Sequence, residues 1–462
     1  MDCGIDITNV VEIDPTVAEH QKLLEAIQGN ILKSHGRDRS IHLFVTFNTS
    51  KVDEVKTWIG NFGKEYVTSA YKQYEQAKKY RETKESETFV NFFLSMKGYM
   101  ELGFSYSKTP TNVYFRGGMQ DPNSLDLLKD PPVDSWETEF QNKYHALIII
   151  ADDDQKNIEN LAKDIIGGFN DIKEEIHIEQ GFVLRERPED NTSPVIEHFG
   201  FRDGVSQPLF MKSDIEKAKS YDDFDKWDPR APLNLVLVED SLGTEDCSYG
   251  SYLVYRKLEQ NVEGWNKDVL KLAEKLDNIE PALAGAYVMG RFQDGTPLVD
   301  SKTPGGDPNT TTNNFNYQAD SEALKCPFHA HIRKTNPRGD TPDDFDNEKM
   351  HRIARRGISY GTESITDVQE ESSGSGLLFL CFQADLGNQF IFMQSNWSNA
   401  PDFVERGVGA DPVIGQGKKT ETYNWPDSWG RPGKKEADFT KWVTMKGGEY
   451  FFAPSMSFFE TL

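Results

Sequence analysis

The stretch His145-Ala-Leu-Ile-Ile-Ile-Ala151 decides the fold of this chain. A short apolar run of this kind, rich in β-branched isoleucine, is typical of a buried strand. It is far shorter than the roughly 20 apolar residues that a helix needs to cross a bilayer. The run therefore predicts a strand in the core of a folded domain, and the elements on either side of it decide which domain.

The segments around this strand alternate between strand and helix patterns. Apolar residues at helical spacing indicate helices, and short apolar or alternating runs indicate strands. The expected elements are the strand 42–47, the helix 52–59, the strand 89–96, the strand 145–151, the helix 158–166 and the strand 175–184. The order β-α-β-β-α-β is the ferredoxin-like pattern.

Another helix is expected near the N-terminus. Asp14 and Pro15 precede apolar residues that continue to Ile27, and Gly29 follows. Proline at the first helical position and glycine beyond the last are common at helix ends. The pattern predicts a helix that Asp14 caps.

The second half of the chain repeats the same alternation. A polar stretch without apolar period, 213–232, separates the halves and predicts domains at 1–225 and 226–462. The later elements are expected at 252–255 (strand), 269–273 (helix), 376–382 (strand), 389–397 (helix) and 450–453 (strand). A second copy of the ferredoxin-like fold is therefore expected.

The excess of acidic over basic residues limits the kinds of partner that the protein can bind. The 462 residues include 51 Lys and Arg against 75 Asp and Glu, a formal net charge of −24. Such a charge repels phosphate backbones and anionic lipids, so we expect neither a nucleic acid nor a membrane partner. Aromatic residues make up 12% of the chain, which indicates a folded protein rather than a disordered one.

The N-terminus and the cysteines bear on the compartment. The residues after Met1 show no basic and apolar leader, which predicts a cytoplasmic protein, or a secreted one if a leader was removed. The four cysteines, Cys3, Cys247, Cys326 and Cys381, form no CxxC pair and are expected to be free thiols.

Three segments carry residues suited to chemistry, and the first is Cys326-Pro-Phe-His-Ala-His-Ile-Arg-Lys. On a strand, His329 and His331 would share one face. The plain interpretation is a pair of strand histidines, one satisfied in the core and one exposed to solvent. With Cys326 and His351 they could hold zinc, although this spacing is not a usual structural zinc pattern. A single imidazole could instead be the axial ligand of haem iron.

The second segment is Glu197-His-Phe-Gly-Phe-Arg-Asp-Gly-Val-Ser-Gln-Pro208. Asp203-Gly204 is a strong turn dipeptide, so a plain turn is one interpretation. Phe199 and Phe201 also put apolar surface next to a carboxylate, where burial would raise its pKa and suit it to acid-base catalysis.

The third segment is Ile353-Ala-Arg-Arg-Gly-Ile-Ser-Tyr-Gly361. Adjacent arginines are most often a solvated pair. A guanidinium beside a carboxylate can also hold a small polar oxidant and stabilise a leaving oxygen anion. The spacing leaves both interpretations open.

Together the three segments resemble the dye-decolourising peroxidase family. Gly200-Phe-Arg-Asp-Gly204 matches its GxxDG motif, 326–335 resembles the segment of its proximal histidine, and 353–361 resembles that of its distal arginine. Further similarity covers 27–33, 288–298, 377–383 and 447–455, so it spans nearly the whole chain and is closest to the longer fungal-like and bacterial branch. The resemblance implies an α+β fold of two ferredoxin-like domains, of the dimeric α+β barrel type with antiparallel sheets, and haem held mainly by the C-terminal half.

The resemblance also implies residue roles. His331 would be the fifth ligand of haem b iron, Asp203 the distal acid and base, and Arg355 the distal arginine, with Arg356 as the alternative. The residues expected against the haem are Arg338 at a propionate, Gly204 of the motif, and Leu380 and Phe382 on the distal side. Asp411 or Asp385 would be the acidic partner of His331.

The implied function is a haem b peroxidase. It would reduce hydrogen peroxide and oxidise phenolic or dye-type aromatic substrates in one-electron steps, with an acidic pH optimum because a nearby arginine keeps Asp203 ionised in acid. Bulky substrates would send electrons through oxidisable side chains. The alternatives are a haem carrier or sensor without turnover, and a metal hydrolase built on His329, His331 and His351.

Overall fold

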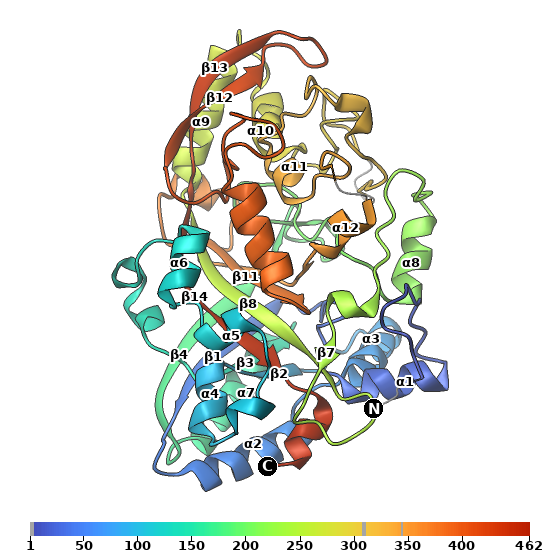
Figure 1. Ribbon diagram of the computed structural model, residues 1–462, viewed down its shortest axis with the longest axis vertical. Coiled ribbons are helices and arrows are strands. Elements are labelled where there is room, and N and C mark those ends of the chain that lie inside the picture. Colours follow the sequence, from blue (N-terminus) through green and yellow to red (C-terminus); the bar gives the residue numbers. More distant parts are fainter. Residues whose placement is uncertain (1–3, 307–310, 343–344) are drawn as a thin grey trace.

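The computed structural model describes residues 4–306, 311–342 and 345–462 of the chain (Figure 1). Its first half contains β1 (Arg39–Phe47), α2 (Val52–Glu65), β2 (Phe89–Leu94), β3 (Ala146–Asp152), α7 (Gln155–Gly168) and β4 (Lys173–Phe182). The strands pair antiparallel in the order β2-β3-β1-β4. The stretch that decides the fold is β3, buried along its whole length between β1 and β2. The ferredoxin-like prediction for this half is confirmed.

The second half repeats this arrangement. It contains β8 (Tyr249–Gln260), α9 (Val262–Lys275), β10 (Ile358–Tyr360), β11 (Gly376–Gln383) and β14 (Val443–Ala453). The strands pair antiparallel in the order β10-β11-β8-β14. In each half the order is therefore second, third, first, fourth, which confirms two ferredoxin-like units.

The two units close into one sheet. The fourth strand of each unit pairs with the second strand of the other, β14 with β2 at Phe452 and Leu94, and β4 with β10 at Phe182 and Ser359. Among the described residues each of these seams has one residue pair, whereas β8 and β14 share a ladder along most of their length. Because the strands close on one another, the buried side chains inside the sheet come from both halves.

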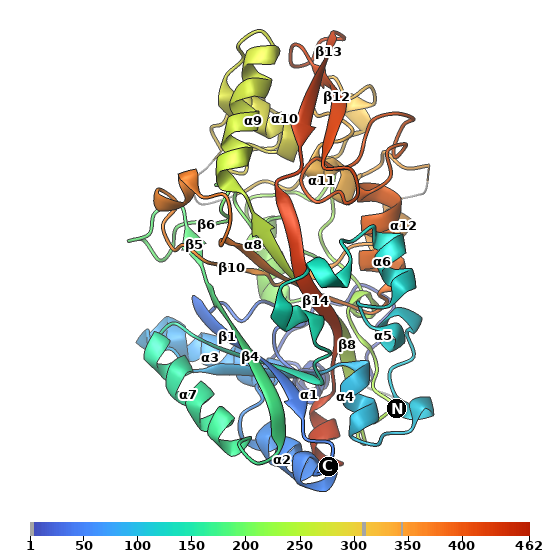
Figure 2. The ribbon, with the colours of Figure 1, turned by 90° about the vertical axis from the view of Figure 1, so that its left-hand side faces the viewer.

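The long connections of the second half position the site. Segments between β8 and β10 and between β11 and β14 form the upper part of the molecule in Figures 1 and 2, beyond the closed sheet. The further helices are α1 (Ala18–Ala26), α3 (Ala70–Thr83), α4 (Met96–Glu101), α5 (Val113–Gly117), α6 (Pro122–Leu128), α8 (Lys212–Lys219), α10 (Pro281–Met289), α11 (His331–Thr335), α12 (Phe345–Met350) and the π-helical pieces η7 (Gly387–Ile391) and η8 (Met393–Ser398). The further strands are β5 (Leu184–Arg185), β6 (Val195–Ile196), β7 (Val238–Glu239), β9 (Ala354–Arg355), β12 (Thr420–Pro426) and β13 (Lys434–Thr440).

Two local predictions are wrong. Helix α1 begins at Ala18, because the Asp14 carboxylate accepts hydrogen bonds from Thr16 in a turn and does not cap the helix. The four cysteines are not all free thiols, since Cys247 is disulfide-bonded while Cys326 and Cys381 are free and buried. Cys3 lies outside the described residues.

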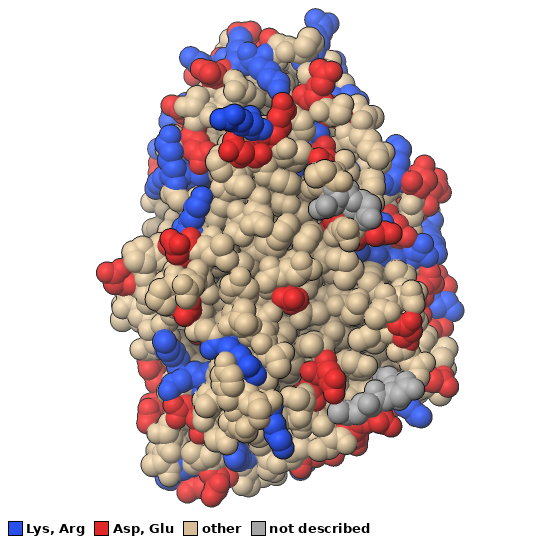
Figure 3. Space-filling view, in the orientation of Figure 1, with Lys and Arg blue, Asp and Glu red and all other residues tan. Residues whose placement is uncertain are grey.

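The surface shows where the charges lie. On the face drawn in Figure 3, the Lys, Arg, Asp and Glu side chains lie mainly around the rim and leave the central area largely uncharged. Among the described residues, no helix is long and apolar enough to cross a membrane.

Candidate active site

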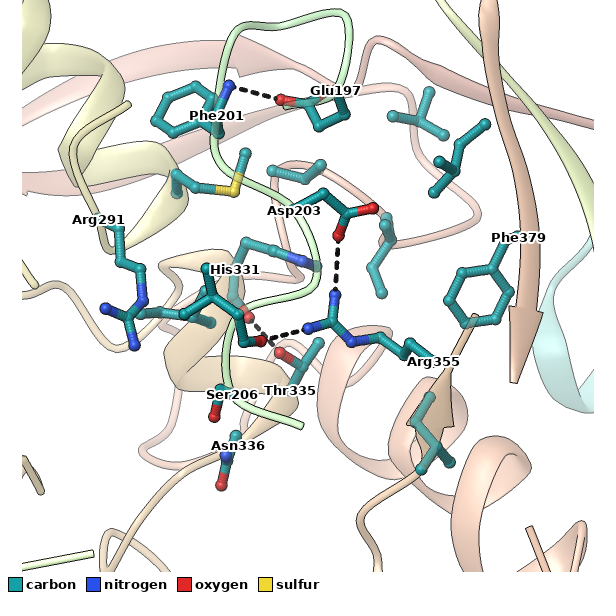
Figure 4. A pocket seen from close by; sticks show the side chains of 18 of the residues that line it. Glu197, Phe201, Asp203, Ser206, Arg291, His331, Thr335, Asn336, Arg355 and Phe379 are labelled. Atoms are coloured by element: carbon teal, nitrogen blue, oxygen red, sulfur yellow. Dashed lines mark hydrogen bonds and ion pairs between the residues drawn. The ribbon is translucent and has the colours of Figure 1, made fainter. Parts of the chain in front are cut away.

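The three segments that carry the chemical residues line one cavity (Figure 4). It lies between the loop after β6, the outer face of β8 and β11, the helix α11 and the π-helical piece η8. The loop contributes Glu197, Asp203 and Ser206, helix α11 contributes His331, and β9 contributes Arg355. The tertiary fold thus brings together residues that are up to about 160 positions apart in the sequence.

One wall of the cavity is organised around His331, the first residue of α11. Its Nδ1 donates to Asp411 Oδ2 at 2.8 Å. Asp411 is fully buried and held in place because its Oδ1 accepts the backbone N–H groups of Val413 at 2.7 Å and Ile414 at 3.1 Å. A carboxylate on Nδ1 leaves Nε2 without a proton, as a metal ligand requires.

The structure thus distinguishes between the two acidic candidates for His331. Asp385 accepts hydrogen bonds from Asn112 at 2.9 Å and from the Gly387 backbone at 2.8 Å. The Asp385 carboxylate is therefore bonded to groups near the start of the π-helical segment. Asp411 is the residue that bonds to His331.

His329 belongs to the core instead of the cavity. The segment is a turn followed by α11, so the two histidines do not share a face of a strand. The His329 ring packs 4.4 Å from the ring of Trp425 and 4.7 Å from that of Tyr423, and burial lowers its pKa to about 3. His351 stacks on Phe392 at 4.0 Å. Within the described part of the chain, no group of three His, Cys, Asp or Glu side chains could hold a metal ion, so the zinc and hydrolase readings find no support.

The same cavity is also lined by a carboxylate and a guanidinium. Arg355 Nη1 lies 3.3 Å from Asp203 Oδ1, and its Nη2 donates to the Val205 carbonyl oxygen at 2.5 Å (Figure 4). The Gly204 N–H donates to Asp203 Oδ1 at 2.6 Å, and Gly204 adopts a φ of +73° that favours glycine. Gly204 supports the carboxylate from behind and is not itself among the lining residues.

The adjacent arginines have separate roles. Arg356 donates to the carbonyl oxygens of Asn30 at 2.7 Å and Ile31 at 2.9 Å, which ties the N-terminal segment to the second half of the chain. Arg355 lines the cavity and Arg356 does not. The register with Arg355 toward the cavity is the one that the structure has.

A cluster of three arginines borders the cavity, two of them buried (Arg291 and Arg338) and one partly buried (Arg352), and sequence reasoning found only Arg338. Arg338 donates to the carbonyl oxygens of Asn313 and Phe315 and to Ser206 Oγ. Arg291 and Arg352 also bond to neutral oxygens, and among the described residues none of the three guanidinium groups forms an ion pair. Burial lowers the pKa of Arg291 and Arg352 to about 10 and that of Arg338 to about 9, so all three remain charged at neutral pH. Arg291 lies within the segment 288–298 that resembles the family, but no role was expected for it, and no motif pointed to Arg352.

The apolar lining from β11 differs from the prediction. Leu377 and Phe379 line the cavity, whereas Leu380 and Phe382 are 2% and 0% exposed and lie in the core. Phe382 packs against Phe93 of β2, with ring centroids 6.0 Å apart. Successive side chains of a strand point to opposite faces, so residues 380 and 382 face the inside of the closed sheet while 377 and 379 face the cavity.

Two further polar groups of the lining escaped the sequence-based assignment. Glu197 was part of the segment singled out, and desolvation raises the pKa of its half-buried carboxyl group to about 7. Arg256 on β8 forms a buried double hydrogen bond with Asp130, at 2.9 and 2.5 Å. Neither residue had a distinguishing spacing in the sequence.

These residues fit a haem. An imidazole whose Nδ1 is engaged leaves Nε2 for an iron. Buried guanidinium groups without carboxylate partners supply a site for anionic groups, such as the two propionates. Apolar side chains, among them Phe379, Phe390 and Ile414, line the same cavity and can cover a porphyrin face.

Comparisons with known proteins agree with this fit. The DyP dimeric alpha+beta barrel domain matches residues 26–185, and the Dyp-type peroxidase C-terminal family matches residues 199–406. A multifunctional dye peroxidase of Amycolatopsis sp. is 35% identical over 99% of this chain and 100% of its own. The dye-decolorizing peroxidase msp1 of Mycetinis scorodonius is 31% identical, over 95% of this chain and 87% of its own. The crystal structure of an Anabaena sp. DyP-type peroxidase is similar with a TM-score of 0.94 and 48% identity, covering 99% of this chain and 98% of that one.

The chain belongs to the dye-decolourising peroxidase family. It is a haem-dependent enzyme that uses hydrogen peroxide and a reducing substrate. The alternative of a haem carrier without turnover is not favoured.

Proposed function

We propose that His331 holds the iron of haem b in this cavity and that Asp203 and Arg355 act on hydrogen peroxide in the same cavity. The observation that carries the proposal is that the Asp411-bound imidazole and the Asp203–Arg355 pair line the same cavity. Most of the lining residues follow residue 226, which supports the expectation that the C-terminal half holds most of the haem. Arg338, Arg291 and Arg352 would bind its propionates.

Bound haem supplies the iron at which the peroxide is reduced and through which electrons are drawn from the reducing substrate. The chain contributes the ligand side: the hydrogen bond from Nδ1 to Asp411 fixes the ring orientation of His331 and keeps Nε2 basic. Asp411 can hold this role because its other oxygen is tied to two backbone N–H groups.

Asp203 would transfer a proton and Arg355 would stabilise a negative charge. Asp203, as a carboxylate, can accept a proton from one oxygen of hydrogen peroxide and return it to the other oxygen. Arg355 remains charged and stabilises the negative charge that grows on the departing oxygen. The Gly204 and Val205 backbone groups hold the two side chains for these tasks.

The reducing substrates are inferred to be aromatic. The names of relatives from Amycolatopsis sp. and Mycetinis scorodonius refer to dyes, and one-electron oxidation suits phenolic and dye-type compounds. The acidic optimum implied by the resemblance stays a prediction. The domain boundary at 225/226, the absence of nucleic acid partners and the cytoplasmic location stay predictions.

The role of His331 is tested with His331→Ala and the matched variant His329→Phe, each purified after haem loading. We expect His331→Ala to lose the Soret band or to change it strongly, while His329→Phe keeps the spectrum of the parent protein. Asp203→Asn should keep the Soret band and lose about 10²–10⁴-fold in peroxide-dependent dye oxidation. An unchanged spectrum in His331→Ala, or full turnover in Asp203→Asn, would contradict the proposal.

A further inference from the structure

Glu197 is a half-buried carboxyl group that has no role in the proposed mechanism. It lines the cavity, yet its partners are groups of its own loop and one side chain of β8 (Figure 4). The loop runs from β6 to Asp203 and is closed by the bridge between Ile196 and Arg202. Glu197 is the first residue inside that bridge, so it can hold the loop from within.

The carboxylate collects three donors. Oε1 accepts the Phe201 N–H at 3.0 Å, Oε2 accepts the Phe199 N–H at 2.9 Å, and Oε2 also accepts a hydrogen bond from the Gln260 side chain. The backbone of Glu197 adds two more bonds, from its N–H to the Phe201 carbonyl at 3.0 Å and from the Gly200 N–H to its own carbonyl at 2.8 Å. Glu197 thus bonds to four backbone groups of the turn, the N–H groups of Phe199, Gly200 and Phe201 and the carbonyl oxygen of Phe201.

The outside of the turn is fixed by packing. The Phe199 ring stacks on Trp265 of α9, with centroids 4.4 Å apart and an interplanar angle of 10°. Gln293 donates to the Phe199 carbonyl at 2.9 Å. Gly200 has a φ of +87°, and a Cβ added there would lie 2.7 Å from Gln293. The turn is therefore held between α9 and the Glu197 carboxylate.

Asp203 leaves this turn directly. Its N–H donates to the Val195 carbonyl at 2.9 Å, next to the bridge, and its carboxylate reaches Arg355 at 3.3 Å. A shift of the turn is transmitted to the Asp203 carboxylate because two residues separate Asp203 from Gly200. A displacement of about 1 Å at a reacting group can cost on the order of 100-fold in rate.

We propose that Glu197, clamped by Gln260, is a positioning residue that presents Asp203 to Arg355 and to hydrogen peroxide. It would act through Asp203 and would not touch the peroxide. This inference rests on the role proposed for Asp203. It adds that the geometry of the acid-base group is set by a second carboxylate on the same loop.

The charge state of Glu197 sets the conditions of the test. Burial raises its pKa to about 7, and Asp203 is the charged group that contributes to this rise. The other groups around it, Gln260 of β8 and the two backbone N–H groups, are neutral donors. Since only the carboxylate accepts from all three donors at once, the comparison is made at pH 8.

The experiment is a double-mutant cycle on the haem-loaded full chain. The variants are Glu197→Gln, Asp203→Asn and the pair together, and the readout is the rate at which hydrogen peroxide changes the Soret absorbance at pH 8. We expect Glu197→Gln alone to lose about tenfold. The double variant should be no slower than Asp203→Asn, because a residue that acts through Asp203 has nothing left to position. A further tenfold loss in the double variant would overturn the proposal.

A control and a second readout separate positioning from general stability. Glu449 of β14 is buried and likewise accepts two backbone N–H groups, those of Met119 and Tyr450, both at 2.8 Å, but it is not among the lining residues. Glu449→Gln should leave the peroxide rate within about twofold. In hydrogen exchange of the full chain, Glu197→Gln should speed exchange in the peptide 197–203 about tenfold and Glu449→Gln should not. Unchanged exchange in Glu197→Gln would overturn the proposal.

If the Glu197→Gln protein does not retain haem, Gln260→Leu provides a second test of the same proposal. It removes the external donor to Glu197 and should speed exchange in the same peptide and slow the peroxide reaction in the same direction. If Asp203→Asn alone keeps full activity, the proposed role of Asp203 fails, and the exchange readout still decides whether Glu197 holds the turn. No change in either readout for Gln260→Leu would contradict the clamp.

Discussion

Asp411 Oδ2 lies 2.8 Å from Nδ1 of His331, although 80 residues of sequence separate the two. The contact places a fully buried carboxylate behind the imidazole that faces the cavity. It sets the tautomer of His331 and the electron density on Nε2. Much of the behaviour of the bound iron should therefore depend on Asp411.

Asp411→Asn is expected to lower activity about 10–100-fold and to shift the haem reduction potential to a more positive value, because the neutral amide no longer makes the imidazole more basic. Turnover with a dye and a spectroelectrochemical titration measure both effects. Asp385→Asn is the matched control, since Asp385 bonds to Asn112 and Gly387 instead of His331. Equal effects of the two substitutions would argue against the special role of Asp411.

The two adjacent arginines should separate activity from stability. Arg355→Leu is expected to lose about 10²–10³-fold in peroxide-dependent turnover while it keeps its haem, because charge on the departing oxygen is no longer stabilised. Arg356→Leu should keep its turnover per haem and lose about 1–3 kcal/mol in the free energy of unfolding, since the carbonyl groups of Asn30 and Ile31 lose their donor. Dye oxidation and urea unfolding are the measurements. The reverse pattern would assign the distal role to Arg356.

Because one face of β11 lines the cavity and the other faces the core, substitutions on the two faces should have different effects. Phe379→Ala opens space in the cavity and should change the Soret spectrum and the KM for dyes. Leu380→Ala removes a core side chain that is 2% exposed and should cost about 2–5 kcal/mol in the free energy of unfolding with an unchanged spectrum. Optical spectra and urea titrations of both variants decide this. A spectral change in Leu380→Ala alone would restore the earlier assignment of Leu380 to the haem.

Acid should unfold the protein through its buried histidines. Burial lowers the pKa of His42 and His145 to about 4 and that of His35 and His329 to about 3. The unfolded chain, with values near 6.5, therefore binds more protons as the pH falls. The stability from each neutral histidine is present above pH 6.5 and is lost as the pH falls toward 3 or 4.

At pH 4.5 each of these histidines should cost about 2–3 kcal/mol relative to pH 7, so unfolding should limit activity on the acid side. The free energy of unfolding, measured in urea between pH 4.5 and 7, should fall steeply. His329→Phe should reduce the slope of the free energy of unfolding against pH by the equivalent of about one proton, because it removes one titrating group. An identical slope in His329→Phe would show that His329 is not buried in its neutral form.

The local pattern of apolar residues was sufficient to predict much of the fold. Apolar runs and helical spacing placed the strands and helices of the first half, because side chains buried on one or both faces impose a period that the sequence shows. The same reasoning misplaced the start of α1, since an aspartate can bond within a turn as well as cap a helix. It left open whether His329 and His331 lie on a strand, where the structure has a turn and α11, because a short polar stretch has no period to distinguish the two.

By itself the sequence determined the two ferredoxin-like units and the three segments that line the cavity, since burial patterns and motif residues are local properties. Only the tertiary structure decided that Asp411 backs His331, that Arg355 and not Arg356 faces the cavity, and that Leu377 and Phe379 line it. These choices depend on contacts between residues far apart in the chain and on the face toward which a strand turns each side chain. A shift of one residue in a strand reverses that face while leaving the local pattern of apolar residues almost unchanged.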